Sequence, residues 1–108
     1  MNRIISFAEF KIIYDTIKGE PEYCFKFQNH DNEYMIIRYK EGPSFQRCGI
    51  SDGSGEFFYS SLDELYMSDL IDNINLSRDW GNIIDIWSND YGSIEELCRI
   101  HKIDLERD

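Results

Sequence analysis

Three cysteines and two histidines are the residues of this 108-residue sequence that could do metal or nucleophilic chemistry. A structural zinc site needs about four Cys or His ligands, usually supplied as closely spaced pairs. The candidates here do not provide two such pairs: Cys24, His30, Cys48, Cys98 and His101. A Cys-His pair with Cys48 or Cys98 as nucleophile stays open, but free cysteines are most often buried and inert. We therefore expect no catalytic residue, no metal and no cofactor.

A glycine-rich segment, residues 49–55, could in principle hold a phosphate or calcium. A phosphate loop should open onto a helix with a lysine nearby, whereas this segment leads into the aromatic run at Phe57. An EF-hand-like frame that starts at Asp52 has Phe57 at its sixth position, where glycine is required. The Asp52-Gly53 pair instead predicts a β-hairpin turn.

Charge is distributed unevenly along the chain. Residues 1–50 contain seven Lys or Arg and seven Asp or Glu, whereas residues 51–108 contain fourteen acids and four bases, which accounts for the whole net charge of -10. Acids in the first turns of helices and in turns have an ordinary structural explanation. That explanation does not account for the missing balancing bases, so plain solubility and a binding role both remain open.

The binding hypothesis predicts a negative surface that meets a basic protein partner. Its expected members are Asp63, Glu64, Asp69, Asp72, Asp79, Asp85 and Asp90. Direct nucleic-acid binding is not expected, because phosphate contacts require a basic stripe and none is readable.

The elements that must position these residues begin with a helix. Ser6 and Glu9 form a capping box, and apolar residues at helical spacing predict a helix over residues 7–18. Alternation at Tyr23, Phe25 and Phe27 predicts a strand. Further strands are predicted at 33–39, 44–50 and 56–59, with Glu41-Gly42-Pro43 breaking the second from the third. Short connections favour an antiparallel meander.

Capping signals return in the second half of the chain. Ser60 and Ser61 predict a helix over residues 61–70, and Ser93 predicts a last helix over residues 93–102. Residues 76–88 are ambiguous, and we favour a short helix at 76–81 followed by a fifth strand near 83–88.

The fold class expected from these elements is α+β. We predict a single domain, residues 1–108, in which a four-stranded antiparallel meander packs with an N-terminal helix and two or three C-terminal helices. The first and last helices are expected on its apolar face. The predicted core includes Tyr23, Phe25, Phe27, Ile36 or Ile37, Phe57 and Leu65.

Composition and local sequence features predict the cellular location of the protein. No apolar run approaches the roughly 20 residues that span a bilayer, no export signal is visible, and an odd number of widely spaced cysteines predicts reduced thiols. We expect a cytoplasmic protein with no membrane contact. One Ala, one Thr and no Val suggest an AT-rich coding sequence, as in many bacteria and phages.

Two functions of different classes are consistent with the sequence, and it leaves the oligomeric state open. The first is a small acidic inhibitor, of the immunity or anti-defence type, that docks its negative C-terminal half onto a basic protein. The alternative is a small enzyme or ligand-binding domain with a pocket between the aromatic sheet and the helices. Enzyme activity has no motif in its favour.

Overall fold

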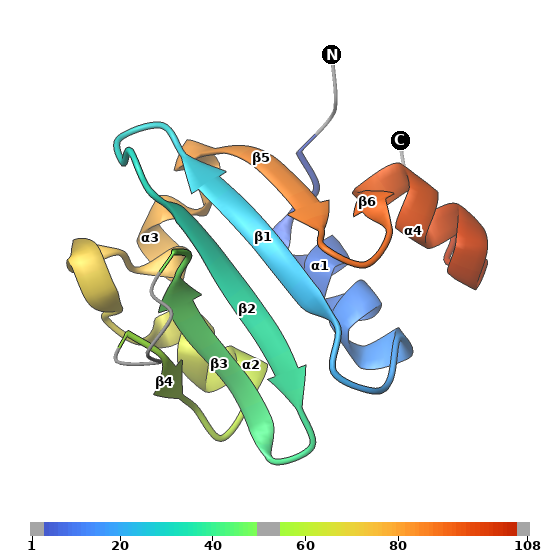
Figure 1. Ribbon diagram of the computed structural model, residues 1–108, viewed down its shortest axis with the longest axis horizontal. Helices are drawn as coiled ribbons and strands as arrows, with labels where there is room; N and C mark the ends of the chain where they lie inside the picture. The colour runs from blue at the N-terminus through green and yellow to red at the C-terminus, as the bar shows by residue number, and fades with distance from the viewer. Residues whose placement is uncertain (1–3, 50–54, 106–108) are drawn as a thin grey trace.

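The fold is a layer of helices against one antiparallel sheet. The computed structural model describes residues 4–49 and 55–105, and within them the sheet has six strands in the order β4-β3-β2-β1-β5-β6. Figure 1 shows α1, α2 and α3 behind the sheet and α4 beside the β5–β6 edge. The α+β class with an antiparallel sheet, predicted from the sequence, is confirmed.

The first four strands form the predicted meander. They are β1 (Glu22–Phe27), β2 (Glu33–Tyr39), β3 (Gly42–Arg47) and β4 (Phe57–Phe58). The third strand begins two residues earlier than predicted, because Gly42 and Pro43 open it instead of breaking the chain. Gly42 has φ +141°, a conformation that suits glycine, and proline is tolerated at the start of a strand. The predicted turn at 51–55 lies almost wholly outside the described residues.

The second half of the chain extends the sheet on the opposite side. β5 (Ile83–Ser88) pairs with β1, which confirms the fifth strand, and the register shifts between Lys26 and Phe27. β6 (Gly92–Ser93) pairs with the end of β5 and is too short to be predicted from alternation. β1 is therefore an interior strand, and its residues Tyr23, Phe25 and Phe27 are buried in the core.

The helices begin at the predicted caps. α1 spans Phe7–Thr16, and the capping box is formed: the Ser6 hydroxyl accepts from the Glu9 amide at 3.1 Å and the Glu9 carboxylate accepts from the Ser6 amide at 2.9 Å. The shorter helices are α2 (Leu62–Met67), α3 (Leu76–Asp79) and α4 (Ile94–His101), with 3-10 turns η1 (Ile71–Asn73) and η2 (Trp80–Asn82).

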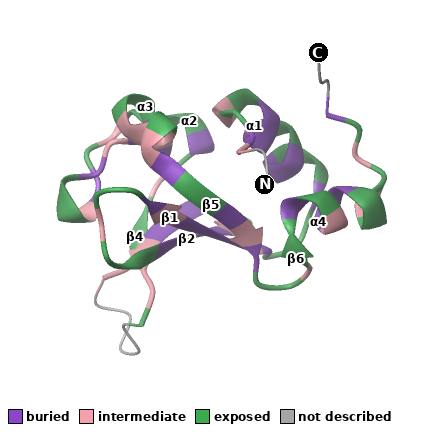
Figure 2. Cartoon of the chain, turned by 90° about the horizontal axis from the view of Figure 1, so that it is seen from above, coloured by how far each residue is buried: buried purple, intermediate pink, exposed green. Residues whose placement is uncertain are grey.

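The core lies between the sheet and the helices, as the purple segments of Figure 2 indicate. Tyr23, Phe25, Phe27, Ile36 and Leu65 are fully buried there, as predicted. Phe57 was predicted wrongly, because it is 46% exposed. β4 has only two residues and lies at the edge of the sheet, so the helices do not close over Phe57. α4 joins the core from the β5–β6 edge instead of lying on the face of the meander.

The two faces of the sheet differ in cover. Side chains alternate along each strand, so Tyr23, Phe25 and Tyr34 point to the helices while their neighbours point to the other side. No described helix covers that second side, which is called the open face below. No helix in the described part of the chain is both long and apolar enough to cross a membrane.

Candidate functional site

The open face is a mixed aromatic and acidic surface built by the alternate residues of five strands. The cross-strand register places Asp85 beside Lys26 and Lys26 beside Glu33 in one row, and Trp87 beside Cys24 and Cys24 beside Met35 in the next. The members of the open face are Glu22, Cys24, Lys26, Glu33, Met35, Ile37, Tyr39, Ser44, Gln46, Phe58, Asp85 and Trp87.

Carboxylates outnumber bases on the open face. Among the described residues of this face, Glu22, Glu33 and Asp85 are balanced by one ammonium, that of Lys26, and Glu33 and Asp85 are exposed. A fourth carboxylate, that of Glu56, is held at the rim, because it accepts hydrogen bonds from the Tyr39 hydroxyl at 2.8 Å and from the Ser44 hydroxyl at 2.7 Å. Burial and the Glu56 carboxylate together raise the pKa of Tyr39 to about 12. The face is therefore negative at neutral pH.

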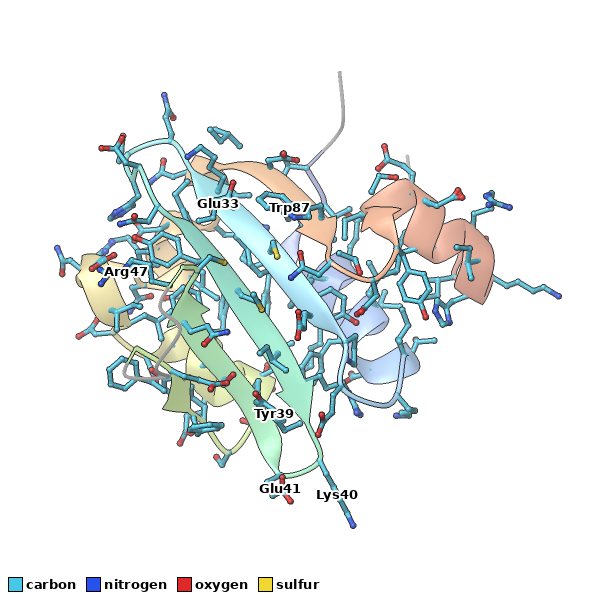
Figure 3. The ribbon with its side chains drawn as sticks, viewed as in Figure 1. Glu33, Tyr39, Lys40, Glu41, Arg47 and Trp87 are labelled. Carbon is cyan, nitrogen blue, oxygen red and sulfur yellow. The ribbon has the colours of Figure 1, made fainter. Side chains whose placement is uncertain are left out.

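Aromatic side chains lie between these charges. Trp87 is half-buried above β1, and Figure 3 shows it and Glu33 on the side of the sheet that the helices leave uncovered. Tyr39 contacts Phe58, with ring centroids 5.7 Å apart, and Phe58 is 65% exposed. Large apolar groups left in water beside charges are characteristic of a recognition surface.

The structure divides the seven acids singled out in the sequence among several places. Asp63 forms an ion pair with Lys11 of α1 at 2.9 Å, and Glu64 accepts from the Ser60 amide as a helix cap. Asp85 belongs to the open face. Asp90 lies at the β5–β6 turn, 3.4 Å from the Glu22 amide.

The remaining three lie together at one end of the molecule. Asp72 is held by two groups, because it accepts from the Tyr34 hydroxyl at 2.5 Å and pairs with Arg47 at 3.1 Å. Asp79 pairs with Arg78 at 2.7 Å, and Asp69 accepts from the Asn75 amide group. Hydrogen bonds from Tyr34 and Arg47 lower the pKa of Asp72, and the hydrogen bond from Arg78 lowers that of Asp79. The two arginines therefore neutralise much of this cluster.

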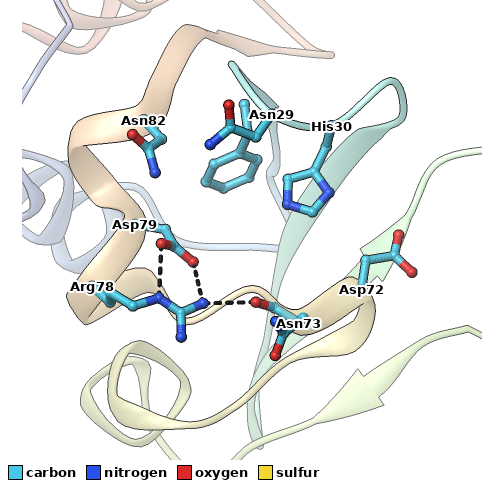
Figure 4. Close-up of a pocket in the computed structure, with 8 residues that line it drawn as sticks. Asn29, His30, Asp72, Asn73, Arg78, Asp79 and Asn82 are labelled. Atoms are coloured by element: carbon cyan, nitrogen blue, oxygen red, sulfur yellow. Dashed lines mark hydrogen bonds and ion pairs between the residues drawn. The ribbon is translucent and has the colours of Figure 1, made fainter.

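A polar hollow of about 200 Å³ adjoins these carboxylates. Figure 4 shows Arg78, Asp79 and Asn82 on one side of it and Asn29 and His30 on the other. Two consecutive residues of its wall, Asp72 and Asn73, have left-handed backbone, with φ of 58° and 62°. Asp and Asn adopt this conformation more readily than other residues, yet it is uncommon and clusters at functional sites. Residue spacing alone carries no signal for this hollow.

The five residues considered for metal or nucleophilic chemistry lie on different elements. Cys24 on β1 and Cys48 just after β3 are separated by β2, and Cys24 and Cys98, the latter on α4, are both buried. His30 lies in the β1–β2 turn, and His101 packs edge-on against Tyr91. Cys48 was expected inside a strand, but it follows β3 and is half-buried. No family model matches the sequence, nor does any curated protein or solved structure.

Proposed function

We propose that this protein is a small binding module that docks its open face onto a basic surface of a protein partner. The observation that carries this proposal is the row Asp85, Lys26 and Glu33 beside the half-buried Trp87, on a sheet face that no described helix covers. The alternation that buries one side of the sheet thus also produces a surface with aromatic anchors and a negative rim.

The physical argument has two parts. Trp, Tyr and Met are enriched at the centres of protein interfaces, and Trp and Tyr bury much area at little entropic cost because they have few rotatable bonds. Carboxylates around them steer a basic partner during encounter and penalise acidic competitors. The net charge of -10 extends this steering over the whole molecule.

The partner class follows from the charge. A protein surface that normally holds phosphate groups carries clustered Lys and Arg, and an acidic face can occupy it in place of nucleic acid. We infer an inhibitor of a nucleic-acid-handling enzyme or toxin, as immunity and anti-defence proteins are. The acidic C-terminal half contributes through Asp85 on the open face, and its other carboxylates add to the long-range field.

Capture from the native host tests the proposal when it is combined with charge reversal. The chain is immobilised as wild type, as the open-face variant Glu33→Lys with Asp85→Lys, and as the control Glu95→Lys with Asp104→Lys, which makes the same charge change at exposed residues on α4 and beyond it. We expect a basic protein that binds the wild type and the control, is lost from the open-face variant, and elutes with salt. Equal capture by the open-face variant, or capture of no basic protein, contradicts the proposal.

The polar hollow favours a second candidate function, the binding of a small polar ligand. Its wall offers the guanidinium of Arg78, the carboxylate of Asp79 and the amides of Asn29 and Asn82, which complement a small zwitterion. Ligand-observed NMR with a mixture of free amino acids tests this: binding that Asn82→Leu abolishes supports it. Absence of binding, or binding that Asn82→Leu leaves unchanged, contradicts it.

A further inference from the structure

A second hollow, of about 250 Å³, is lined by residues of α1, of the β2–β3 turn and of the start of α2. It is named the Arg38 hollow below, after the guanidinium in its wall. Side chains alternate along β2, and Tyr34 and Ile36 are buried against the helices, so Arg38 points to the same side. The guanidinium therefore lies on the side of the sheet opposite to the open face.

Arg38 is held in place by Tyr14 of α1. Its Nε donates to the Tyr14 carbonyl oxygen at 3.0 Å, and its guanidinium carbon lies 5.3 Å from the centre of the Tyr14 ring. These contacts use the Nε–H and the face of the guanidinium, and they leave its two terminal amino groups for other partners. The side chain is thus oriented to present a pair of parallel donors.

This guanidinium has no carboxylate partner in the part of the chain that the structure describes. Three of the four arginines there do form ion pairs with a carboxylate: Arg47, Arg78 and Arg99. Arg38 forms none, although the chain has 21 acids for 11 lysines and arginines. An oriented and unmatched guanidinium beside a hollow is suited to bind an anionic group from outside the chain.

The other charges around the Arg38 hollow limit the charge of that anion. Lys11 and Asp63 pair with each other at 2.9 Å, and Lys40 and Glu41 are adjacent, exposed and extend from the β2–β3 turn in Figure 3. Asp15, which is exposed on α1, is left over. One negative charge on the ligand balances Arg38, whereas a dianion such as a phosphate monoester would add a surplus charge near Asp15.

We propose that the Arg38 hollow binds a small monocarboxylate. The carboxylate accepts two parallel hydrogen bonds from the terminal amino groups of Arg38, which is the strongest pairing that a guanidinium makes. Pro43 and Leu62 are buried residues of the same wall and offer apolar contact to the body of the ligand. The volume is below that of sites for drug-sized molecules, so the ligand is small. This site does not rest on the docking proposed above.

NMR titration of the isotope-labelled full chain with benzoate, and with benzamide as its neutral counterpart, tests the proposal. We expect benzoate to shift the signals of Arg38 and Tyr14 saturably, with a dissociation constant of about 1–10 mM, and benzamide to leave them unchanged. Arg38→Gln should weaken benzoate binding at least about 10-fold, because hydrogen bonds between charged groups are the strong ones. Arg38→Lys keeps the charge but not the paired donors, so it should also bind more weakly than the wild type.

A matched variant and two further ligands make the test decisive. Arg99→Gln makes the same change on α4 and should bind benzoate like the wild type, with circular dichroism showing that each variant is folded. An acetylated dipeptide with a free or an amidated C-terminus shows whether a chain end supplies the carboxylate: the free form then binds more tightly than benzoate.

Four results overturn the proposal. They are equal binding of benzamide and benzoate, no saturable binding up to about 20 mM, an equal loss in Arg99→Gln, and tighter binding of inorganic phosphate than of benzoate. Unchanged binding in Arg38→Gln overturns it as well. Where Arg38→Gln does not fold, Arg38→Lys decides, and wild-type affinity in that variant overturns the paired hydrogen bonds from Arg38.

Discussion

The hydroxyl of Tyr34, whose ring is buried in the core, donates a 2.5 Å hydrogen bond to Asp72, a left-handed residue in the wall of the polar hollow. Removing this hydroxyl leaves a carboxylate with one partner fewer. We expect Tyr34→Phe to lower the free energy of unfolding by about 1–3 kcal/mol, the usual cost of a lost hydrogen bond to a charged group. Urea denaturation measures it.

Tyr66→Phe is the matched control for that change. Tyr66 stacks on Phe7 in the helix layer, and among the described residues its hydroxyl has no hydrogen-bond partner. The same atom is removed, so a shift under about 0.5 kcal/mol is expected. A Tyr34→Phe variant as stable as Tyr66→Phe would show that the contact to Asp72 contributes nothing.

Lowering the pH should reduce the folding stability of the wild type, in part through protonation of Asp72. Tyr34 and Arg47 lower its pKa in the folded state, so the stability that this carboxylate contributes is present above its ordinary pKa and is lost as pH falls through the lowered one. We expect Asp72→Asn to be less stable than the wild type at pH 7 and to lose less of its stability between about pH 4 and pH 2. Parallel pH curves for the two chains would contradict this.

A substitution at Gly42, the first residue of β3, tests the backbone packing that follows the turn from β2. A Cβ placed on it would lie 2.2 Å from the Tyr59 carbonyl oxygen, and its φ of +141° strains any L side chain. We expect Gly42→Ala to cost about 2–4 kcal/mol, as backbone clashes at special conformations do. Gly81→Ala meets no atom within 4 Å and should be close to neutral. Thermal unfolding of both variants compares them, and equal stability would refute the account of this turn.

Cys48 should be the most reactive thiol. It is half-buried rather than buried, and its pKa is lowered from the ordinary cysteine value by its interaction with the Cys24 thiol. Thiolates are the reactive form, so iodoacetamide should modify Cys48 faster than Cys98 at pH 7, with a rate midpoint below the ordinary cysteine value. Cys24→Ala removes the neighbouring thiol and should shift that midpoint upward. Mass spectrometry of the peptides decides the order of labelling, and faster labelling of Cys98 would be the opposite result.

The fold could be predicted largely because local signals agreed with it. Ser6, Ser61 and Ser93 each accept a hydrogen bond from an amide three residues on, so capping marked three helix starts. Strict alternation at Tyr23, Phe25 and Phe27 marked a strand with one buried face. Boundaries were less accurate: α1 ends at Thr16, two residues before its predicted end, and β3 starts earlier than predicted.

The sites were much harder to predict, because they depend on which strands are neighbours. Nothing in the sequence shows that β5 returns to pair with β1, yet this pairing is what sets Trp87 beside Cys24 and Asp85 beside Lys26. The excess of acids in the second half of the chain pointed to these carboxylates, but it did not reveal which basic residues they pair with. Asp63 and Asp72 pair with Lys11 and Arg47, which come from the neutral first half of the chain.

The affinity of Trp87→Ala for the isolated partner tests the central claim, a docking surface on the open face, most directly. Ile100→Ala, which shortens a 47%-exposed apolar residue on α4, is the control. With both variants shown to be folded by circular dichroism, the account predicts that Trp87→Ala raises the dissociation constant roughly 30-fold or more, as loss of an interface hot spot does, while Ile100→Ala changes it less than about twofold. Equal affinities for Trp87→Ala and the wild type would contradict the account.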